Sequence, residues 1–334
     1  MARTLDDLAR LSGVSRATVS RVINGGSVAQ ETRQKVLDVL ETTNYRPNLA
    51  ARNLASGKSG VVGVVMHIEA QLTFSDDYFA GLLSGITDSL TAEAAGMMLW
   101  LGSRTKEETL DQILSMGMLD GVIVTADTID DPLVDGLRQS YLPTVLIGHR
   151  RSDRDASYVD IDNEAASMLI TDHLISSGRV RIGHITGRIT SVSARDRLVG
   201  YRRSMRRAGL DVDDLVVEGE YTPESGYKGA MALLDAGVDA IFCASDYMAK
   251  GAIDAIRNAR LRIPDDIAIA GFDDLRFAAD LTPPLTTMRQ DIQGIGHEAA
   301  RSLLRLLDDP EGTPRRVLLP TELVVRQSTG IASG

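Results

Sequence analysis

The sequence predicts a small all-α helix-turn-helix head followed by an α/β body with two lobes, each built on a doubly wound parallel sheet. Apolar residues recur at helical spacing through the first 45 residues, with a glycine turn between two short segments. From Val61 onward, short β-rich runs alternate with amphipathic stretches, which is typical of parallel sheets covered by helices on both faces. Nine such runs are many for one open sheet, so we expect two sheets.

The first helix of the head is predicted to begin at Leu5. Thr4 can cap it, and Asp7 stands three residues further on, near the positive end of the helix dipole. Gly13 should end this helix, because the tight turn that follows needs a residue that tolerates a positive φ.

Two further helices complete the head. Ser15 can cap a second helix over residues 16–24, and a third is expected over residues 30–43, before Pro47 blocks helical continuation. Apolar side chains of the second helix should face the first helix, which leaves an outer face with Arg16, Ala17, Ser20 and Arg21. This arrangement is that of a helix-turn-helix.

The head is basic and the body is acidic. Of 36 Lys and Arg and 46 Asp and Glu residues, nine basic and five acidic ones fall within residues 1–60. The head therefore carries +4 and the remainder −14, within a net charge of −10. Such a head attracts phosphate while the body repels it, which argues against a protein that coats nucleic acid with its whole surface.

Cysteine usage and hydropathy indicate a cytoplasmic protein. Cys243 is the only cysteine, so no intramolecular disulfide can form, and we expect it to be a small buried residue of a strand. The N-terminus has no apolar signal core, and the longest apolar runs are far too short to span a bilayer.

The sequence contains no recognisable catalytic or metal-binding constellation. None of the five histidines is spaced from another His or Cys as a metal ligand would be. The Gly57-Lys58-Ser59 trio is not a phosphate loop, because Arg52 stands where the first glycine of that motif belongs. We therefore expect no metal, no cofactor and no enzymatic activity.

The predicted domain boundaries follow the change of pattern. The head takes residues 1–46, a hinge helix and linker take 47–60, and the body takes 61–334. Residues 292–307 read as a helix that returns to the first lobe. The N-lobe should therefore contain about 61–161 and 292–320, and the C-lobe about 162–289 and 321–334.

The motifs of the head resemble a known family. They are Leu5-x-x-Leu8-Ala9, Gly13-Val14-Ser15, Thr18-Val19-Ser20-Arg21-Val22-Ile23-Asn24, Thr32-Arg33-x-Lys35-Val36 and Asn44-Tyr45-x-Pro47-Asn48, followed by Leu54. In this order they resemble the lactose-repressor (LacI/GalR) family of bacterial transcription regulators.

The resemblance continues through the body. Its motifs there are Ser193-Ala194-Arg195-x-Arg197-Leu198-x-Gly200-Tyr201, Ser245-Asp246-x-Met248-Ala249-x-Gly251, Pro264-x-Asp266-Ile267, Gly271-Phe272-Asp273-Asp274 and Pro283-Pro284-Leu285-Thr286-Thr287. The resemblance implies a body similar to periplasmic sugar-binding proteins, with a ligand between the lobes at the carboxyl ends of the strands.

For the head, the resemblance implies roles at the DNA. Arg16, Ala17 and Arg21 fall where the family reads base edges in the major groove, and arginine pairs well with guanine O6 and N7. The positions implied to contact phosphate are Ser15, Thr18, Ser20, Asn24 and Tyr45. The positions implied in the minor-groove hinge are Asn48, Ala51 and Leu54, with Leu54 as the wedge that kinks the duplex, and Ala50 and Ala51 are small enough for two hinge helices to approach each other.

For the body, the resemblance implies an effector pocket. Arg197 and Asp273 match the family's effector clamp, whereas Asp274 is expected to cap a helix. Other pocket-lining positions are Ser245, Asp246, Tyr221, Asp76, Tyr78, Ser103 and His149. Two positions depart from the family pattern: Ser245 replaces a more usual Asn, and His149 follows Gly148 where many members have an Asp.

These features predict a homodimeric repressor that binds a pseudo-palindromic operator and is released by a sugar or glycoside. The main alternative is a regulator that needs a purine-like corepressor to bind DNA. More distant alternatives are a solute-binding protein and an α/β enzyme, but the basic head and the absence of a signal core disfavour the first, and no motif supports the second. Tetramers of the family carry a C-terminal leucine-heptad tail, and this sequence ends without such heptads, so the resemblance implies a dimer rather than a tetramer.

Overall fold

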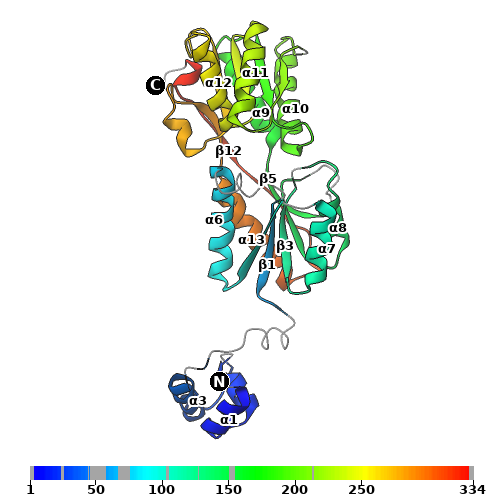
Figure 1. Cartoon of the computed structure of the whole chain (residues 1–334), viewed down its shortest axis with the longest axis vertical. Coiled ribbons are helices and arrows are strands. Elements are labelled where there is room, and N and C mark those ends of the chain that lie inside the picture. The colour runs from blue at the N-terminus through cyan, green and yellow to red at the C-terminus, as the bar shows by residue number, and fades with distance from the viewer. Residues whose placement is uncertain are drawn as a thin grey trace. The chain divides into compact units, whose positions relative to one another are not determined.

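The computed structural model describes residues 4–23, 26–43, 45, 58–66, 76–102, 105–126, 128–149, 155–212 and 214–330. The chain divides into two compact units, Met1–Ser59 and Gly60–Gly334, called the head and the body below (Figure 1). The predicted fold class is confirmed: a helical head precedes an α/β body with two mostly parallel sheets.

Three helices form the head: α1 (Leu5–Ser12), α2 (Arg16–Ile23) and α3 (Gln30–Thr43). Local caps set their ends as predicted. The Thr4 hydroxyl accepts a hydrogen bond from Asp7 N at 3.2 Å, Gly13 has φ 65°, and the Ser15 hydroxyl accepts from Thr18 N at 3.2 Å. Leu8, Val19, Val22 and Val36, one or two from each helix, are the buried centre of the head.

The first lobe of the body, lobe 1, is a six-stranded parallel sheet with helices on both faces (Figure 1). In spatial order its strands are β11 (Arg316–Leu319), β5 (Ser157–Ile161), β4 (Thr144–Ile147), β3 (Gly121–Thr125), β1 (Val61–Met66) and β2 (Gly96–Leu101). Its helices are α6 (Asp77–Ala92), α7 (Lys106–Met116), α8 (Pro132–Gln139) and α13 (Ile292–Asp308).

The second lobe, lobe 2, repeats this plan. In spatial order its strands are β12 (Thr321–Val324), β10 (Thr286–Gln290), β9 (Ala268–Asp273), β8 (Ala240–Cys243), β6 (Ile182–Thr186) and β7 (Val216–Glu218). Its helices are α9 (Asn163–Ser176), α10 (Val192–Arg207), α11 (Pro223–Asp235) and α12 (Asp246–Asn258). All neighbouring strands are parallel except β12, which is antiparallel to β10. Cys243 is buried in β8, as predicted.

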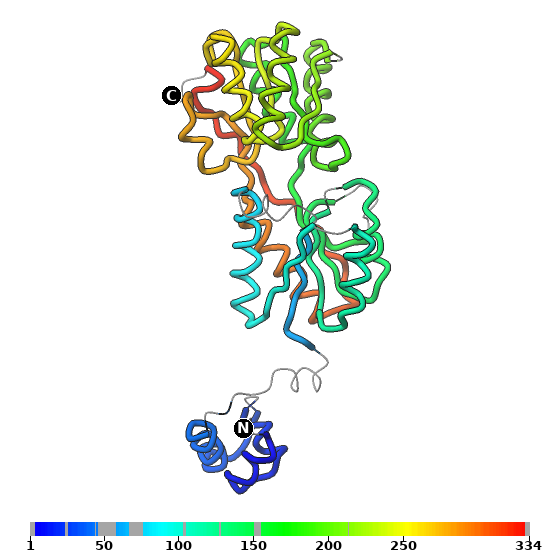
Figure 2. Tube along the Cα trace, viewed as in Figure 1, coloured from blue at the N-terminus to red at the C-terminus, as the bar shows by residue number. Residues whose placement is uncertain are grey.

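The chain passes between the lobes three times. It crosses from β5 to α9, from β10 to α13, and from β11 to β12, as the green, orange and red segments of Figure 2 show. Helix α13 therefore packs beside α6 in lobe 1, where Gly85 permits close contact: a Cβ there would lie 2.0 Å from the Gln293 carbonyl oxygen. In each lobe, residues predicted to bind a ligand follow the carboxyl ends of the parallel strands.

Some elements differ from those expected. Strands β7, β11 and β12 were not predicted, because each is short and contains charged residues. Helix α10 begins at Val192, where the Ser191 side chain caps it by accepting a hydrogen bond from Ala194 N. The prediction that Asp274 caps a helix was wrong: its carboxylate instead pairs with Arg326 at 2.6 Å and with Arg289 at 2.7 Å.

Candidate functional site

Helix α2 presents the predicted DNA-reading residues on its outer side. Val19 and Val22 are buried against the other two helices, whereas Arg16, Ala17 and Arg21 are exposed. The contact between Arg16 and Asp6 is long, at 3.8 Å, and both side chains are mostly exposed, so it holds Arg16 only weakly. An exposed arginine pair on a short helix is well suited to reach the edges of bases.

Four of the five residues predicted to contact phosphate lie within the described part of the head. Ser15 is exposed at the start of α2, and Thr18 and Ser20 are half-buried. Tyr45 packs against the apolar centre of the head. Arg33, to which we assigned no role, donates from Nη2 to the Gly26 carbonyl at 2.7 Å and so supports the chain between α2 and α3. Asn24, Asn48, Ala50, Ala51 and Leu54 lie outside the described residues.

In lobe 2, Arg197 is buried on α10 and held in place by three contacts. Its Nε donates to Asn163 Oδ1 at 2.9 Å, and its Nη1 donates to the Ala244 carbonyl at 2.6 Å. Its guanidinium carbon lies 3.6 Å from the centre of the Phe272 ring, a favourable cation–π distance. These contacts orient the guanidinium before any ligand arrives.

Asp273 stands beside Arg197 at the carboxyl end of β9. Its Oδ1 lies 4.0 Å from Arg197 Nη1 and accepts a hydrogen bond from Gln290 Nε2 at 2.6 Å. Its φ of 116° is unusual for a residue other than glycine. Burial raises the pKa of the Asp273 carboxyl to about 7, although the Arg197 charge and the Gln290 hydrogen bond favour the ionised form.

Asp246, the first residue of α12, is fully buried near Asp273. Its Oδ1 accepts from the Thr287 hydroxyl at 2.6 Å, and its Oδ2 accepts from Leu275 N at 2.8 Å. Burial, and then the charge of Asp273, raise the pKa of Asp246 well above its ordinary value. Two interacting buried carboxyls cannot both ionise readily, so this pair is able both to donate and to accept hydrogen bonds.

The start of α6 in lobe 1 faces this group of residues. Asp77 N donates to the hydroxyl of Tyr247, the second residue of α12 in lobe 2, at 3.4 Å. Asp76 caps α6 by accepting from Tyr78 N at 2.8 Å, and burial raises the pKa of the Asp76 carboxyl. The negative charge of Asp76 also contributes to the raised pKa of Asp273. The structure thus brings predicted effector-binding residues of both lobes close enough for their charges to interact.

His149 follows β4 in lobe 1 and is firmly positioned. Its Nδ1 lies 2.7 Å from Asp160 Oδ2, and its ring stacks on Tyr158 with the centroids 4.2 Å apart. Asp160 and Asn163 were not predicted from the sequence to be site residues. Both lie where β5 passes into α9. Only the tertiary contacts with His149 and Arg197 reveal them.

Two other predicted residues have local partners in lobe 2. The Ser245 hydroxyl caps α12 by accepting from Met248 N at 3.2 Å. The Tyr221 hydroxyl lies 3.3 Å from Ser191 Oγ and 3.2 Å from Ser193 Oγ. Ser103 lies outside the described residues, so its place in the predicted pocket stays a prediction.

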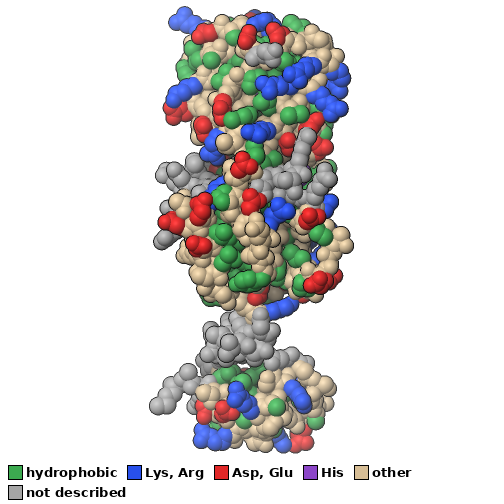
Figure 3. Space-filling view, turned by 90° about the vertical axis from the view of Figure 1, so that its right-hand side faces the viewer, with side chains coloured by type: hydrophobic (Ala, Val, Ile, Leu, Met, Phe, Trp, Pro, Cys, Tyr) green, Lys and Arg blue, Asp and Glu red, His purple; other side chains and the backbone are tan. Residues whose placement is uncertain are grey.

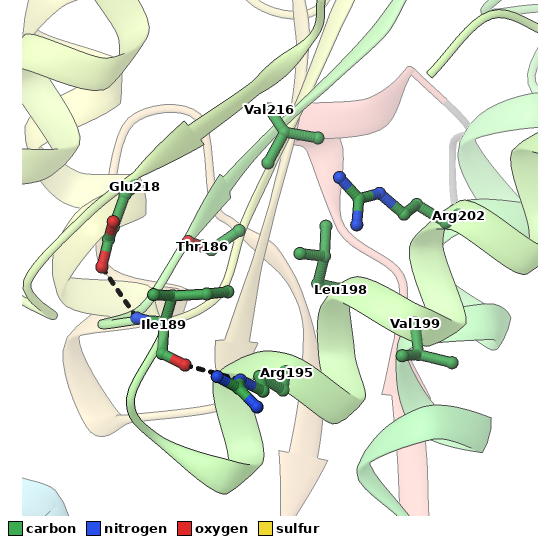
Figure 4. A pocket seen from close by; sticks show the side chains of 8 residues that line it. All are labelled: Thr186, Ile189, Arg195, Leu198, Val199, Arg202, Val216 and Glu218. Atoms are coloured by element: carbon green, nitrogen blue, oxygen red, sulfur yellow. Dashed lines mark hydrogen bonds between the residues drawn. The ribbon is translucent and has the colours of Figure 1, made fainter. Parts of the chain in front are cut away.

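A cavity of about 450 Å³ lies between α10 and strands β6 and β7 of lobe 2 (Figure 4). Leu198 and Val216 line it with Arg202, whose buried Nε has no hydrogen-bond partner in the described structure. None of the predicted effector residues lines this cavity. We favour the Arg197–Asp273 neighbourhood as the effector site, because it combines buried charges of both signs at the carboxyl ends of strands.

Other classes of site are not apparent in the part of the chain that the structure describes. No group of three or more His, Cys, Asp or Glu residues there could hold a metal ion. Likewise, none of the helices within the described ranges has the length and apolar character needed to cross a membrane. On the face shown in Figure 3, acidic and basic side chains are interspersed over the body.

Comparisons with known proteins match both parts of the chain. The family described as "Bacterial regulatory proteins, lacI family" matches residues 4–48, and "Periplasmic binding protein-like domain" matches residues 171–329. The HTH-type transcriptional regulator CelR of Thermobifida fusca is 36% identical over 332 residues, which are 97% of this chain and 98% of that protein. The HTH-type transcriptional repressor PurR of Mannheimia succiniciproducens is 30% identical, with 97% and 98% covered.

Solved structures show the same likeness over nearly the whole chain. The lac repressor dimer bound to operator and the anti-inducer ONPF is similar with a TM-score of 0.87 at 29% identity, covering 98% of this chain and 99% of that one. A CelR–cellobiose complex is similar with a TM-score of 0.77 at 34% identity, with the same coverage.

Proposed function

The chain belongs to the lacI family of bacterial regulatory proteins and is a DNA-binding transcriptional regulator, and we propose that a sugar or glycoside bound between its lobes releases it from its operator. The observation that carries this proposal is the buried Arg197–Asp273 pair at the carboxyl ends of the lobe 2 strands, opposite Asp76 of lobe 1. A charged donor beside carboxyl acceptors suits a ligand with several hydroxyl groups.

At the operator, we propose that Arg16, Ala17 and Arg21 read base edges while hydroxyl groups around α2 hold phosphates. The exposure of these three side chains on one face of α2 supports this assignment. Ser15, Thr18, Ser20, Asn24 and Tyr45 are the proposed phosphate contacts, and Asn48, Ala51 and Leu54 the proposed minor-groove contacts. A homodimer would place two heads on the two halves of a pseudo-palindromic site.

At the effector site, Arg197 and Asp273 are the proposed clamp, with Asp246, Asp76, Tyr78, Tyr221, Ser245, Ser103 and His149 around them. The complex of the similar protein CelR with cellobiose supports a disaccharide as the first ligand to try. We infer a binding role without catalysis, and a cytoplasmic protein, because the family consists of regulators that bind DNA.

The test couples DNA selection to sugar titration. The full chain first selects duplexes from a random library, and we expect a pseudo-palindrome. Cellobiose should then weaken binding to the selected duplex in a fluorescence anisotropy titration. Arg197→Ala should abolish this response, whereas Arg207→Ala, on the same helix but exposed and paired with Asp172, should preserve it. A normal response in Arg197→Ala would refute the clamp.

The second candidate is a corepressor-dependent regulator with a purine-like ligand, the alternative that the sequence leaves open; the similar protein PurR is named a transcriptional repressor. The two candidates predict opposite effects of the ligand on operator affinity. A purine base such as guanine would tighten operator binding, whereas a sugar inducer would weaken it. The same titration with guanine in place of cellobiose therefore separates them.

A further inference from the structure

A continuous series of polar side chains, called the polar chain below, runs through the body from lobe 1 to lobe 2. From His149 it passes to Asp160 at 2.7 Å, to Asn163 at 3.3 Å, to Arg197 at 2.9 Å, to Asp273 at 4.0 Å and to Gln290 at 2.6 Å. Every step but the fourth is at hydrogen-bond distance.

Two members of the polar chain stand at the passages between the lobes. Asn163 is the first residue of α9, directly after the chain leaves β5 of lobe 1. Gln290 is the last residue of β10, directly before the chain returns to lobe 1 through α13. Arg197 is therefore bonded to one passage through Asn163 and is connected to the other through Asp273 and Gln290.

The burial of these residues makes the connection stiff. Asn163 and Gln290 are each 5% exposed, Arg197 is 6% exposed and Asp273 is 7% exposed. A buried polar group that loses its partner without gaining water is destabilised, so these side chains must move together or exchange partners. Hydrogen bonds are also stronger in such a low-dielectric surrounding.

We propose that Asn163 and Gln290 are positioning residues that join the Arg197–Asp273 pair to two of the three passages between the lobes. This inference rests on the proposed function, since it takes Arg197 and Asp273 as the effector clamp. A ligand that displaces Arg197 then moves both of these passages together, through Asn163 on one side and through Asp273 and Gln290 on the other. The angle between the lobes changes as a result. Asn163 acts through Arg197 and does not need to touch the ligand.

The first test needs no ligand. Hydrogen–deuterium exchange of the full chain is compared between wild type and Asn163→Ala. We expect amides of residues 286–292, at the second passage, to exchange about tenfold faster in the variant, because Arg197 loses its Nε acceptor. An unchanged rate there, with faster exchange confined to residues 161–166, would overturn the proposal and leave Asn163 a local support of α9.

Two further variants sharpen this test. Asn163→Asp retains an oxygen acceptor for Arg197 but loses the amide that donates to Asp160, so residues 286–292 should keep their wild-type exchange rate. It also serves if Asn163→Ala fails to fold, because faster exchange at 286–292 in Asn163→Asp would then overturn the proposal. Asn258→Ala is the matched control: Asn258 ends α12 in lobe 2, is exposed and lies outside the polar chain.

The second test measures the coupling itself. The ratio of operator Kd values with and without saturating cellobiose is determined for each variant. We expect Asn163→Ala to reduce this ratio at least about fivefold and Asn258→Ala to leave it unchanged. Weaker cellobiose binding with an unchanged ratio at saturation would overturn the proposal. If cellobiose does not bind the wild type, the sugar assignment fails, and the exchange experiment still decides the role of Asn163.

Discussion

Replacing Arg197 by Met tests the central pair of the proposed effector site. Methionine retains most of the side-chain volume but removes the charge near Asp273 and the donors to Asn163 and Ala244. Removing one partner of a buried ion pair typically costs about 3–5 kcal/mol, because the other charge stays buried without compensation. We expect a loss of that size in the free energy of unfolding of the body at pH 8.

The loss should depend on pH in a direction that the structure determines. The pKa of Asp273 is raised from 3.8 to about 7 in the folded protein, so between these values the folded state retains a proton that the unfolded state has released. Stability therefore falls by about 1.4 kcal/mol per pH unit as the pH rises, and this fall ends near pH 7 in the wild type. Without the Arg197 charge the folded pKa is higher, and the fall continues further.

The difference in stability between wild type and Arg197→Met should thus widen by about 1–2 kcal/mol between pH 6 and pH 8. Urea unfolding followed by circular dichroism at pH 6, 7 and 8 measures it. Asp273→Asn, alone and combined with Arg197→Met, is the control, since asparagine does not titrate and the widening should disappear. A difference that is constant with pH, or a widening that survives Asp273→Asn, would refute the coupling of these two residues.

Three other predictions address the head, the hinge and the packing of lobe 1. Arg16→Ala should cost roughly 1–3 kcal/mol on the selected operator and little on random DNA, as measured by anisotropy; equal losses would make Arg16 a phosphate contact. Leu54→Ala should reduce DNA bending in a gel-mobility or energy-transfer assay, and an unchanged bend angle would show that Leu54 is not the wedge. Gly85→Ala should destabilise lobe 1 by about 1–3 kcal/mol, because the new Cβ would lie 2.0 Å from the Gln293 carbonyl oxygen. Gly81→Ala should destabilise it much less, because a Cβ there would meet only the Ile292 side chain, at 3.3 Å. Equal decreases of the melting temperature in the two variants would contradict this prediction.

Local signals predicted the head well. The cap at Thr4, the positive φ of Gly13 and the cap at Ser15 all lie within a few residues of the helices they delimit, so the sequence contains the whole interaction. The exposed face of α2 follows in the same way from the spacing of Val19 and Val22.

The body was predicted less completely. Its long apolar strands were evident because both faces of a parallel sheet are buried, as the five consecutive buried residues of β1 show. The short strands β7 and β11 carry charged residues and lie at or near sheet edges, where burial leaves little trace in the sequence. For Asp274 the sequence suggested a local cap, but the carboxylate lies where Arg289 and Arg326 converge from other strands and loops.

The sequence by itself determined the helix that we propose to read DNA, its basic face and the alternation that makes two α/β lobes, because each depends on residues within one or two turns or strands of each other. The tertiary structure decided that Asn163, Arg197, Asp273 and Gln290 meet. These residues lie on α9, α10, β9 and β10. They meet only because the sheet order places β9 beside β10 and because two of the three passages between the lobes run close to Arg197 and Asp273. Periodicity shows that a residue is buried but not which distant residue it contacts, and in this protein those distant contacts form the proposed effector site.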